Sequence, residues 1–487
     1  MKSLAQRALD TAVQQGAEYA DVRLAEERHR SFTTKNGRIG HVADSESHGV
    51  GVRALVGGSW GFAATDALTP EGVDGAAAEA IAIARASARV QARPAVLAPE
   101  PARSGVWVSP CQIDPFSISL EASLELLFAV DRELRAVDGV TLAETGMEFH
   151  RTHQWFLSSE GADQEQTRTS SGAGFAAYSF GENEIQKRSY PNSFGGQHQL
   201  KGYELIHELR LEENARRVAE EAVALHQAEQ CPQFTGTLVL DSSQLGLQIH
   251  ESIGHPIELD RVLGSEANFA GGSFLSLDKL RHLRYGSELV NVVADARLEH
   301  GPGLGSFAFD DEGVPASCSD IVRQGEFCGY IMSRETAAQI GEPRSNGCMR
   351  AESWNRLPLI RMTNISILPG ERGLSPDELI ADVAEGIYME TNRSWSIDDK
   401  RYNFQFGCEL GWVIRNGRKA RMVKNPSYSG ITTEFWNSLD AICSREHWTL
   451  WGTPNCGKGQ PQQTMGTGHG AAPARFRNIK IGSAYAR

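Results

Sequence analysis

Two histidines flank a glutamate within residues 247–256, where His250, Glu251 and His255 form the pattern H-E-x-x-x-H. Imidazoles are common zinc ligands, and a carboxylate beside one of them can take up the proton of a metal-bound water. The pattern is one residue longer than H-E-x-x-H, in which both histidines lie on one face of a helix. The residue types therefore indicate metal-dependent hydrolysis, provided that the extra residue can be accommodated.

The extra residue matters because of helix geometry. On a regular α-helix, residues five apart differ by about 140° in direction, so His250 and His255 would not face one ion. Gly254 can adopt backbone angles that other residues avoid, and Pro256 disfavours the helical conformation of the residue before it. We therefore expect the helix to end or bulge at Gly254, so that His255 turns back toward the metal.

A catalytic zinc usually has three protein ligands and an open position for water. Cys456 is the best candidate for the third ligand, because we expect it to lie in a glycine-bracketed loop where a thiol can approach a metal closely. Lys458 would favour the thiolate, the form that binds zinc. His469 and Glu258 remain alternative third ligands. A buried and inert thiol is the non-functional alternative for Cys456.

A second acidic group is Asp310-Asp311-Glu312, which Gly313 follows directly. These carboxylates could bind a hard cation or form a hydrogen bond to a metal-ligating histidine. An acidic turn closed by glycine is the simpler interpretation, and the sequence favours it.

The metal-binding segment needs a helix to present it. Residues 237–240 form a short apolar strand, after which Asp241 or Ser242 can cap a helix that carries His250. Upstream, helical signals occur at 2–15, 70–90, 119–137 and 203–228, and strand signals at 19–34, 38–44, 48–64 and 140–190. Downstream of residue 260, the strand signals lie at 290–299, 321–333, 357–368, 402–415 and 419–424.

These elements predict an α+β fold with two domains. Residues 1–230 would form an N-terminal domain of helices and antiparallel sheet. Residues 231–487 would form a strand-rich C-terminal catalytic domain that carries the metal-binding helix. A chain of 487 residues is long enough to give both domains a substantial core.

The composition of the chain indicates which binding partners and which cellular compartment to expect. The net charge of 48 − 61 = −13 argues against a general nucleic-acid binder. No run of about 18 apolar residues predicts a membrane span, and the first residues lack the apolar segment of a secretory signal. The eight cysteines show no C-x-x-C spacing, which fits a reducing compartment. We therefore expect a cytoplasmic protein that binds neither nucleic acid nor membranes.

The chain resembles the TldD/PmbA family of metalloproteases, specifically its motif-bearing TldD side. The resemblance rests on the order and spacing of short segments along nearly the whole chain. These segments are Gly-Val-Gly-Val-Arg at 49–53, Trp-Gly-Phe-Ala at 60–63, His-Glu-Ser-Ile-Gly-His at 250–255, Phe-Asp-Asp-Glu-Gly at 309–313, Arg-Met-Thr-Asn at 361–364, Pro-Gly at 369–370 and Cys-Gly-Lys at 456–458.

The resemblance implies a zinc site formed by His250, His255 and Cys456, with Glu251 as the catalytic base. It also implies cleavage of flexible or unfolded peptides, and a homodimer or a heterodimer with a PmbA-like paralogue. Residues 389–394 lack the glycine-rich run expected there, so the substrate contacts and the choice of partner stay open.

The leading hypothesis is therefore a zinc-dependent metalloprotease in which Glu251 activates the metal-bound water. One alternative is a metal-stabilised scaffold that captures peptides or regulates a partner without cutting. Another is a metal-dependent hydrolase of a non-peptide amide. Glu251 discriminates against the scaffold, because a purely structural site does not need it. In the peptidase, an extended substrate could add to a strand edge of the C-terminal domain.

Overall fold

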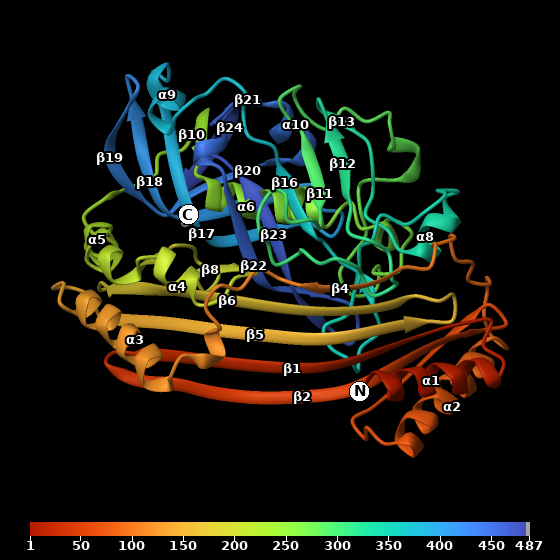
Figure 1. The fold of residues 1–487 in the computed structure, drawn as a ribbon. Coiled ribbons are helices and arrows are strands. Elements are labelled where there is room, and N and C mark those ends of the chain that lie inside the picture. Colours follow the sequence, from red (N-terminus) through yellow and green to blue (C-terminus); the bar gives the residue numbers. More distant parts are fainter. Residues whose placement is uncertain (484–487) are drawn as a thin grey trace.

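One long sheet, antiparallel except for the parallel pairing of β4 with β6, forms the base of the N-terminal part, as Figure 1 shows. The computed structural model describes residues 1–483. The strand order is β3-β2-β1-β5-β6-β4, and β7 and β8 also pair with β6. Asn36 and Gly37 both have positive φ angles, as a tight turn between β1 and β2 requires. The strands are β1 (Tyr19–Lys35), β2 (Arg38–Val56), β3 (Ser59–Thr65), β4 (Ser104–Val108), β5 (Leu142–Ser158), β6 (Asp163–Phe180), β7 (Ile185–Tyr190) and β8 (Gln197–Gln199).

Helices cover one face of this sheet through two apolar clusters. One cluster joins α1 and α2 to β1, β2 and β3, and the other joins α3, α4 and α5 to β1, β5 and β6. Thr69 caps α2 and Ser119 caps α3, each through a side-chain oxygen that accepts a backbone N–H. The helices are α1 (Lys2–Gln14), α2 (Pro70–Ser87), α3 (Leu120–Arg135), α4 (Glu204–Glu208) and α5 (Leu211–Ala224).

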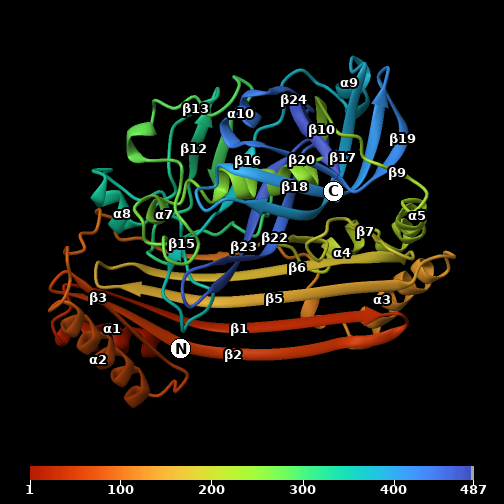
Figure 2. The same cartoon turned by 180° about the vertical axis from the view of Figure 1, so that it is seen from behind.

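The C-terminal part packs on the opposite face of the long sheet (Figure 2). It contains an eight-stranded sheet in the order β17-β10-β24-β20-β18-β19-β9, to which β21 is added through β24. Its strands are β9 (Glu229–Gln230), β10 (Phe234–Leu240), β17 (Glu385–Ile397), β18 (Asn403–Arg415), β19 (Arg418–Lys424), β20 (Pro426–Ile431), β21 (Leu439–Ile442) and β24 (Ala474–Ser483).

A six-stranded sheet in the order β13-β12-β11-β16-β23-β22 completes the C-terminal part. Helix α6 (Ser242–Ile249) lies between the two sheets, in contact with β17 of one and β23 of the other. The remaining elements are β11 (Val292–Asp295), β12 (Cys318–Arg323), β13 (Glu326–Phe327), β14 (Met349–Arg350), β15 (Leu359–Ile360), β16 (Asn364–Ile367), β22 (Thr449–Lys458), β23 (Gln463–Ala471), α7 (Leu259–Val262), α8 (Arg334–Gln339), α9 (Pro376–Ala381) and α10 (Thr432–Asn437).

The acidic segment Asp310-Asp311-Glu312 joins the two parts of the molecule. Arg53 on β2 contacts Glu312 at 3.3 Å, and Arg23 on β1 lies 3.5 Å from Asp311. All three carboxylates are buried, so the expected acidic turn is present but is not a surface turn. Burial and the neighbouring Glu312 hold the pKa of Asp310 well above its usual range. Among residues 1–483, this segment belongs to no group of side chains spaced to hold a metal.

The predicted α+β class and the strand-rich C-terminal part are confirmed. The predicted division near residue 230 remains a prediction. Strand β9 ends at Gln230 and β10 begins at Phe234, and both belong to the eight-stranded C-terminal sheet. Within the described residues, no helix is long and apolar enough to cross a membrane.

Candidate metal centre

Helix α6 leads into the H-E-x-x-x-H motif in the interior of the C-terminal part. Asp241 caps the helix, and its carboxylate accepts hydrogen bonds from the N–H groups of Ser243 and Gln244 at 2.9 and 3.1 Å. Every residue from 243 to 249 is buried, which suits a helix enclosed between two sheets. The predicted cap therefore fixes where the helix starts, and with it the position of His250.

The extra residue of the motif is accommodated in a π-helical turn over His250–Gly254. The N–H of His255 donates to the carbonyl of His250 at 3.1 Å, five residues earlier. A π-turn has more residues per turn than an α-helix, so residues five apart come to the same side. The bulge predicted from the five-residue spacing is present.

The expected reason for the bulge was wrong in part. His255 keeps helical angles (φ −69°, ψ −40°), although Pro256 follows it. Pro256 acts differently: it has no N–H to donate to the carbonyl of Ser252, and that carbonyl accepts instead from the hydroxyl of Tyr285. Gly254 is needed for space, because a Cβ there would overlap the sulfur of Met362.

The structure brings His250, His255 and Cys456 together. One potential ligand atom from each lies within 4.8 Å of the others, and all three residues are buried. The Nε2 atom of His255 is 3.9 Å from the Sγ atom of Cys456. Cys456 lies on β22 rather than in the expected loop, because the segment pairs with β23.

The two alternative ligands lie behind the histidines. His469 places its Nε2 atom 2.7 Å from Nδ1 of His250, and Glu258 places a carboxylate oxygen 3.2 Å from Nδ1 of His255. Each contact occupies Nδ1 and leaves Nε2 of the motif histidine for an ion. Contacts of this kind orient metal-ligating histidines in other proteins.

Three family models match most of the chain. Residues 20–84 match PmbA/TldA metallopeptidase domain 1, residues 113–226 the central domain, and residues 235–483 the C-terminal domain. The chain belongs to the PmbA/TldD metallopeptidase family. The resemblance inferred from the short sequence segments is confirmed.

Named relatives of this PmbA/TldD family member agree with the match. A metalloprotease of Methanothermobacter thermautotrophicus is 30% identical over 471 residues, which are 96% of each chain. A zinc metalloprotease TldD homolog of Saccharolobus solfataricus is 28% identical over 245 residues, which are 50% of this chain and 51% of that protein. The solved structure of TldE from Thermococcus kodakarensis shares the fold, with a TM-score of 0.72, 15% identity, and coverage of 99% of this chain and 100% of that one.

Burial and neighbouring charges shift the pKa values of Cys456 and His250. Burial opposes ionisation of Cys456, but His255 and Arg361 outweigh it, and the pKa of the thiol is lowered. Burial also lowers the pKa of His250 and keeps its ring neutral. Lys458, expected to favour the thiolate, donates to Asp260 at 2.8 Å, and the groups that lower the pKa of the thiol are His255 and then Arg361.

Arg401 is a site residue of this PmbA/TldD family member that the sequence did not reveal. Its guanidinium lies 2.7 Å from the carboxylate of Glu251, and Glu251 is 5% exposed. Arg401 lies 150 residues after Glu251, in the turn that precedes β18. No local motif marks it, because only the packing of that turn against the helix brings the two side chains together.

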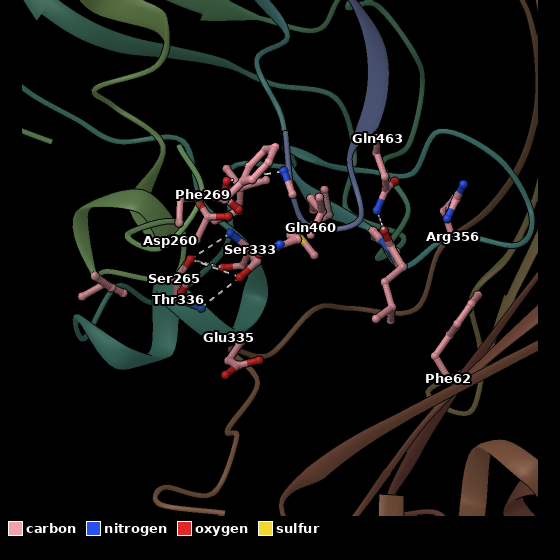
Figure 3. A pocket seen from close by; sticks show the side chains of 18 of the residues that line it. Phe62, Asp260, Ser265, Phe269, Ser333, Glu335, Thr336, Arg356, Gln460 and Gln463 are labelled. Atoms are coloured by element: carbon pink, nitrogen blue, oxygen red, sulfur yellow. Dashed lines mark hydrogen bonds between the residues drawn. The ribbon is translucent and has the colours of Figure 1, made fainter. Parts of the chain in front are cut away.

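A pocket of about 640 Å³ has Asp260 on its wall, and its lining does not include His250, His255 or Cys456. The ammonium of Lys458 donates to the carboxylate of Asp260 on the pocket wall. The same ammonium lies 3.5 Å from the carboxylate of Glu258, which contacts His255. The pocket is therefore connected to the metal-binding residues through two side chains. Figure 3 shows other side chains that line it, including Phe62, Phe269, Arg356 and Gln463.

Proposed function

We propose that this protein is a zinc-dependent metallopeptidase that hydrolyses flexible or unfolded peptides. His250, His255 and Cys456 would hold the ion, and Glu251 would act as the general base. The convergence of these three ligands beside a buried carboxylate carries the proposal. Two neutral imidazoles and a thiolate are a suitable donor set for zinc, and three protein ligands leave a position open for water.

The roles of the side chains follow from their contacts. When bound, the ion would polarise the substrate carbonyl and acidify a water. Glu251, adjacent to His250 in the chain, takes up a proton and passes it to the leaving amine. His469 and Glu258 keep the two imidazoles oriented, and Arg401 holds the Glu251 carboxylate in place.

An extended peptide could add to a strand edge of the C-terminal part. Strand β22 carries Cys456 and ends the six-stranded sheet, and Gln197 already bonds the carbonyl of Leu450 and the N–H of Gly452 on this edge, so a peptide could pair only beyond Gly452 there. Main-chain hydrogen bonds to a sheet edge recognise a peptide with little regard to its side chains. Peptides without stable structure would therefore be the substrates, since a folded protein cannot offer an extended segment.

We also propose a dimer as the working form, either of two copies or with a PmbA-like paralogue. The resemblance of the sequence to the TldD side of the family supports this assembly. Light scattering on the chain alone and after co-expression with the paralogue tests it. A monomer in both samples would contradict it.

A non-catalytic scaffold is the second candidate, and the Arg401–Glu251 ion pair favours it. An arginine that neutralises the carboxylate could serve structure alone. In a scaffold, an extended peptide would bind and remain uncut. The two functions therefore differ in whether Glu251 is needed after the metal has bound.

Two substitutions test the peptidase. Glu251→Gln should keep the metal and lose at least about a hundredfold in activity, because a general base contributes that much or more. Cys456→Ala should lose the ion held by His250 and His255 together with the activity, whereas Cys443→Ala, another buried cysteine, should lose neither. Metal content by mass spectrometry and cleavage of an unfolded peptide, with and without the paralogue, are the measurements. Full activity in Glu251→Gln, or full metal content in Cys456→Ala, would overturn the proposal.

A further inference from the structure

A second group of histidines surrounds a carboxylate on the long N-terminal sheet. His29 on β1 pairs directly with His150 on β5, and Glu148 lies two residues before His150 on the same face. Gly172 on β6 pairs with Glu148 on one side and with His198 of β8 on the other. Strand pairing therefore places all four side chains on the face turned toward the C-terminal part.

The distances in this group suit ligands of one ion. A carboxylate oxygen of Glu148 lies 3.9 Å from Nε2 of His29 and 3.7 Å from Nε2 of His150, and its other oxygen lies 3.3 Å from Nδ1 of His198. Two ligands of one tetrahedral zinc with bonds of about 2.1 Å are themselves about 3.4 Å apart. The two longer distances exceed those of hydrogen bonds.

Two buried imidazole nitrogens in this group lack hydrogen-bond partners within the described residues. Nε2 of His29 and Nε2 of His198 are buried and have no hydrogen-bond partner among residues 1–483. His198 is only 5% exposed. A buried polar atom without a partner destabilises the fold, and such an atom needs a reason to be retained. A bound cation shared with Glu148 would provide that reason for His29, whose Nε2 faces the carboxylate.

The backbone leaves space for this arrangement. A Cβ at Gly172 would overlap Nδ1 of His198, so a larger residue there would displace the imidazole from Glu148. The rings of His29 and His150 are stacked, with centroids 4.1 Å apart and an angle of 18° between their planes. The His150 side chain must turn to share an ion with His29, and its exposed fraction of 51% allows this.

We propose that His29, Glu148 and His150, supported by His198, bind a divalent transition-metal ion, most readily zinc. Imidazole and carboxylate ligands without a thiol suit zinc, nickel and copper alike. The ion would join β1, β5 and β8. Because Gln197 of β8 donates to the carbonyl of Leu450 on β22 at 2.9 Å, it would also steady the strand that carries Cys456.

Metal stoichiometry of the untagged full chain tests the proposal without any measurement of activity. The parent should bind two zinc ions per chain. Cys456→Ala and the double variant His29→Ala/His150→Ala should each bind one, and the triple variant should bind none. His153→Ala is the matched control, because His153 lies on the other face of β5 and bonds Glu165 at 2.8 Å. It should bind two ions.

Cobalt substitution separates the two centres. Cobalt bound to Cys456→Ala should show no thiolate charge-transfer band. When His29→Ala and His150→Ala are added to this variant, the affinity of the protein for cobalt should fall more than tenfold. Equal thermal unfolding of the metal-free forms would show that these variants fold. The proposal is overturned if Cys456→Ala binds no ion, or if the double variant binds as many ions as the parent.

Discussion

Arg401 is the charged side chain in contact with Glu251, and the pair is largely enclosed. A base that must reach a water beside the metal needs a fixed position, and Nη1 of Arg401 holds one oxygen of the Glu251 carboxylate at 2.7 Å. Removal of Arg401 would leave the carboxylate without this support. The loss would affect turnover and leave the metal ligands unchanged.

We predict that Arg401→Ala lowers kcat by about 10- to 100-fold, the range found for side chains that orient metal-site residues, while the zinc content stays at the parent value. Arg401→Lys should recover part of the loss, because the lysine ammonium keeps the positive charge but lacks the planar guanidinium. Arg415→Ala is the control, since Arg415 on β18 is exposed. Steady-state kinetics with metal analysis checks this, and unchanged kcat in Arg401→Ala would remove the positioning role.

At the scale of elements, the π-turn carries the site. Its geometry depends on Gly254, which lies against the fully buried sulfur of Met362. An added methyl group would push either the turn or Met362 out of place. A movement of the turn would shift His255 relative to His250 and Cys456.

We predict that Gly254→Ala destabilises the fold by about 1–3 kcal/mol, the usual cost of overpacking a core. It should also weaken zinc binding. Gly75→Ala in α2 is the control, because no atom lies within 4 Å of the added Cβ, and a gain of about 0.5–1 kcal/mol is expected there. Urea denaturation of the metal-free proteins measures both changes. Equal stability of Gly254→Ala and the parent would show that the contact with Met362 is not limiting.

The local features of the site could be predicted from the sequence because neighbouring residues determine them. The cap at Asp241 and the bulge at residues 250–254 follow from residue types within one or two turns of the helix. Cys456 was predicted as the third ligand from its glycine-bracketed segment, with His469 and Glu258 as alternatives, and the family resemblance supported that choice. Its strand conformation could not be predicted locally, because it depends on pairing with β23.

The contacts that the sequence did not reveal all join distant segments. Tyr285 bonds the carbonyl of Ser252, and Arg401 holds Glu251. Neither residue belongs to a recognisable motif, and the residue type alone does not indicate the contact, because arginine and tyrosine occur in many structural roles. Only the packing of the two sheets around α6 brings these side chains to the motif.

At the scale of the whole molecule, buried ion pairs join the two parts. Arg53 lies 2.6 Å from Asp21 on its own sheet and 3.3 Å from Glu312 of the C-terminal part, and all three are buried. Removing the arginine would leave two buried carboxylates without this cation. An unpaired buried charge is far more costly than the loss of an exposed ion pair.

We predict that Arg53→Ala destabilises the protein by about 3–5 kcal/mol, as expected for one partner of a buried pair. Arg28→Ala is the matched control, because Arg28 pairs with Asp44 at the surface and should cost no more than about 1 kcal/mol. Urea unfolding monitored by fluorescence checks both values. If Arg53→Ala lowered the free energy of unfolding no more than Arg28→Ala does, the contact between the two parts of the molecule would tolerate unpaired carboxylates.

The place of β24 has a consequence for biosynthesis. This strand lies between β10 and β20 in the eight-stranded sheet, yet the ribosome makes it after both of them. Strand β17 pairs with both β10 and β18, so the strands are already joined on that side, and residues 474–483 close the remaining gap between β10 and β20. Under the proposed function, the closed sheet around α6, and with it the complete site, exists only after residues 474–483 have been made.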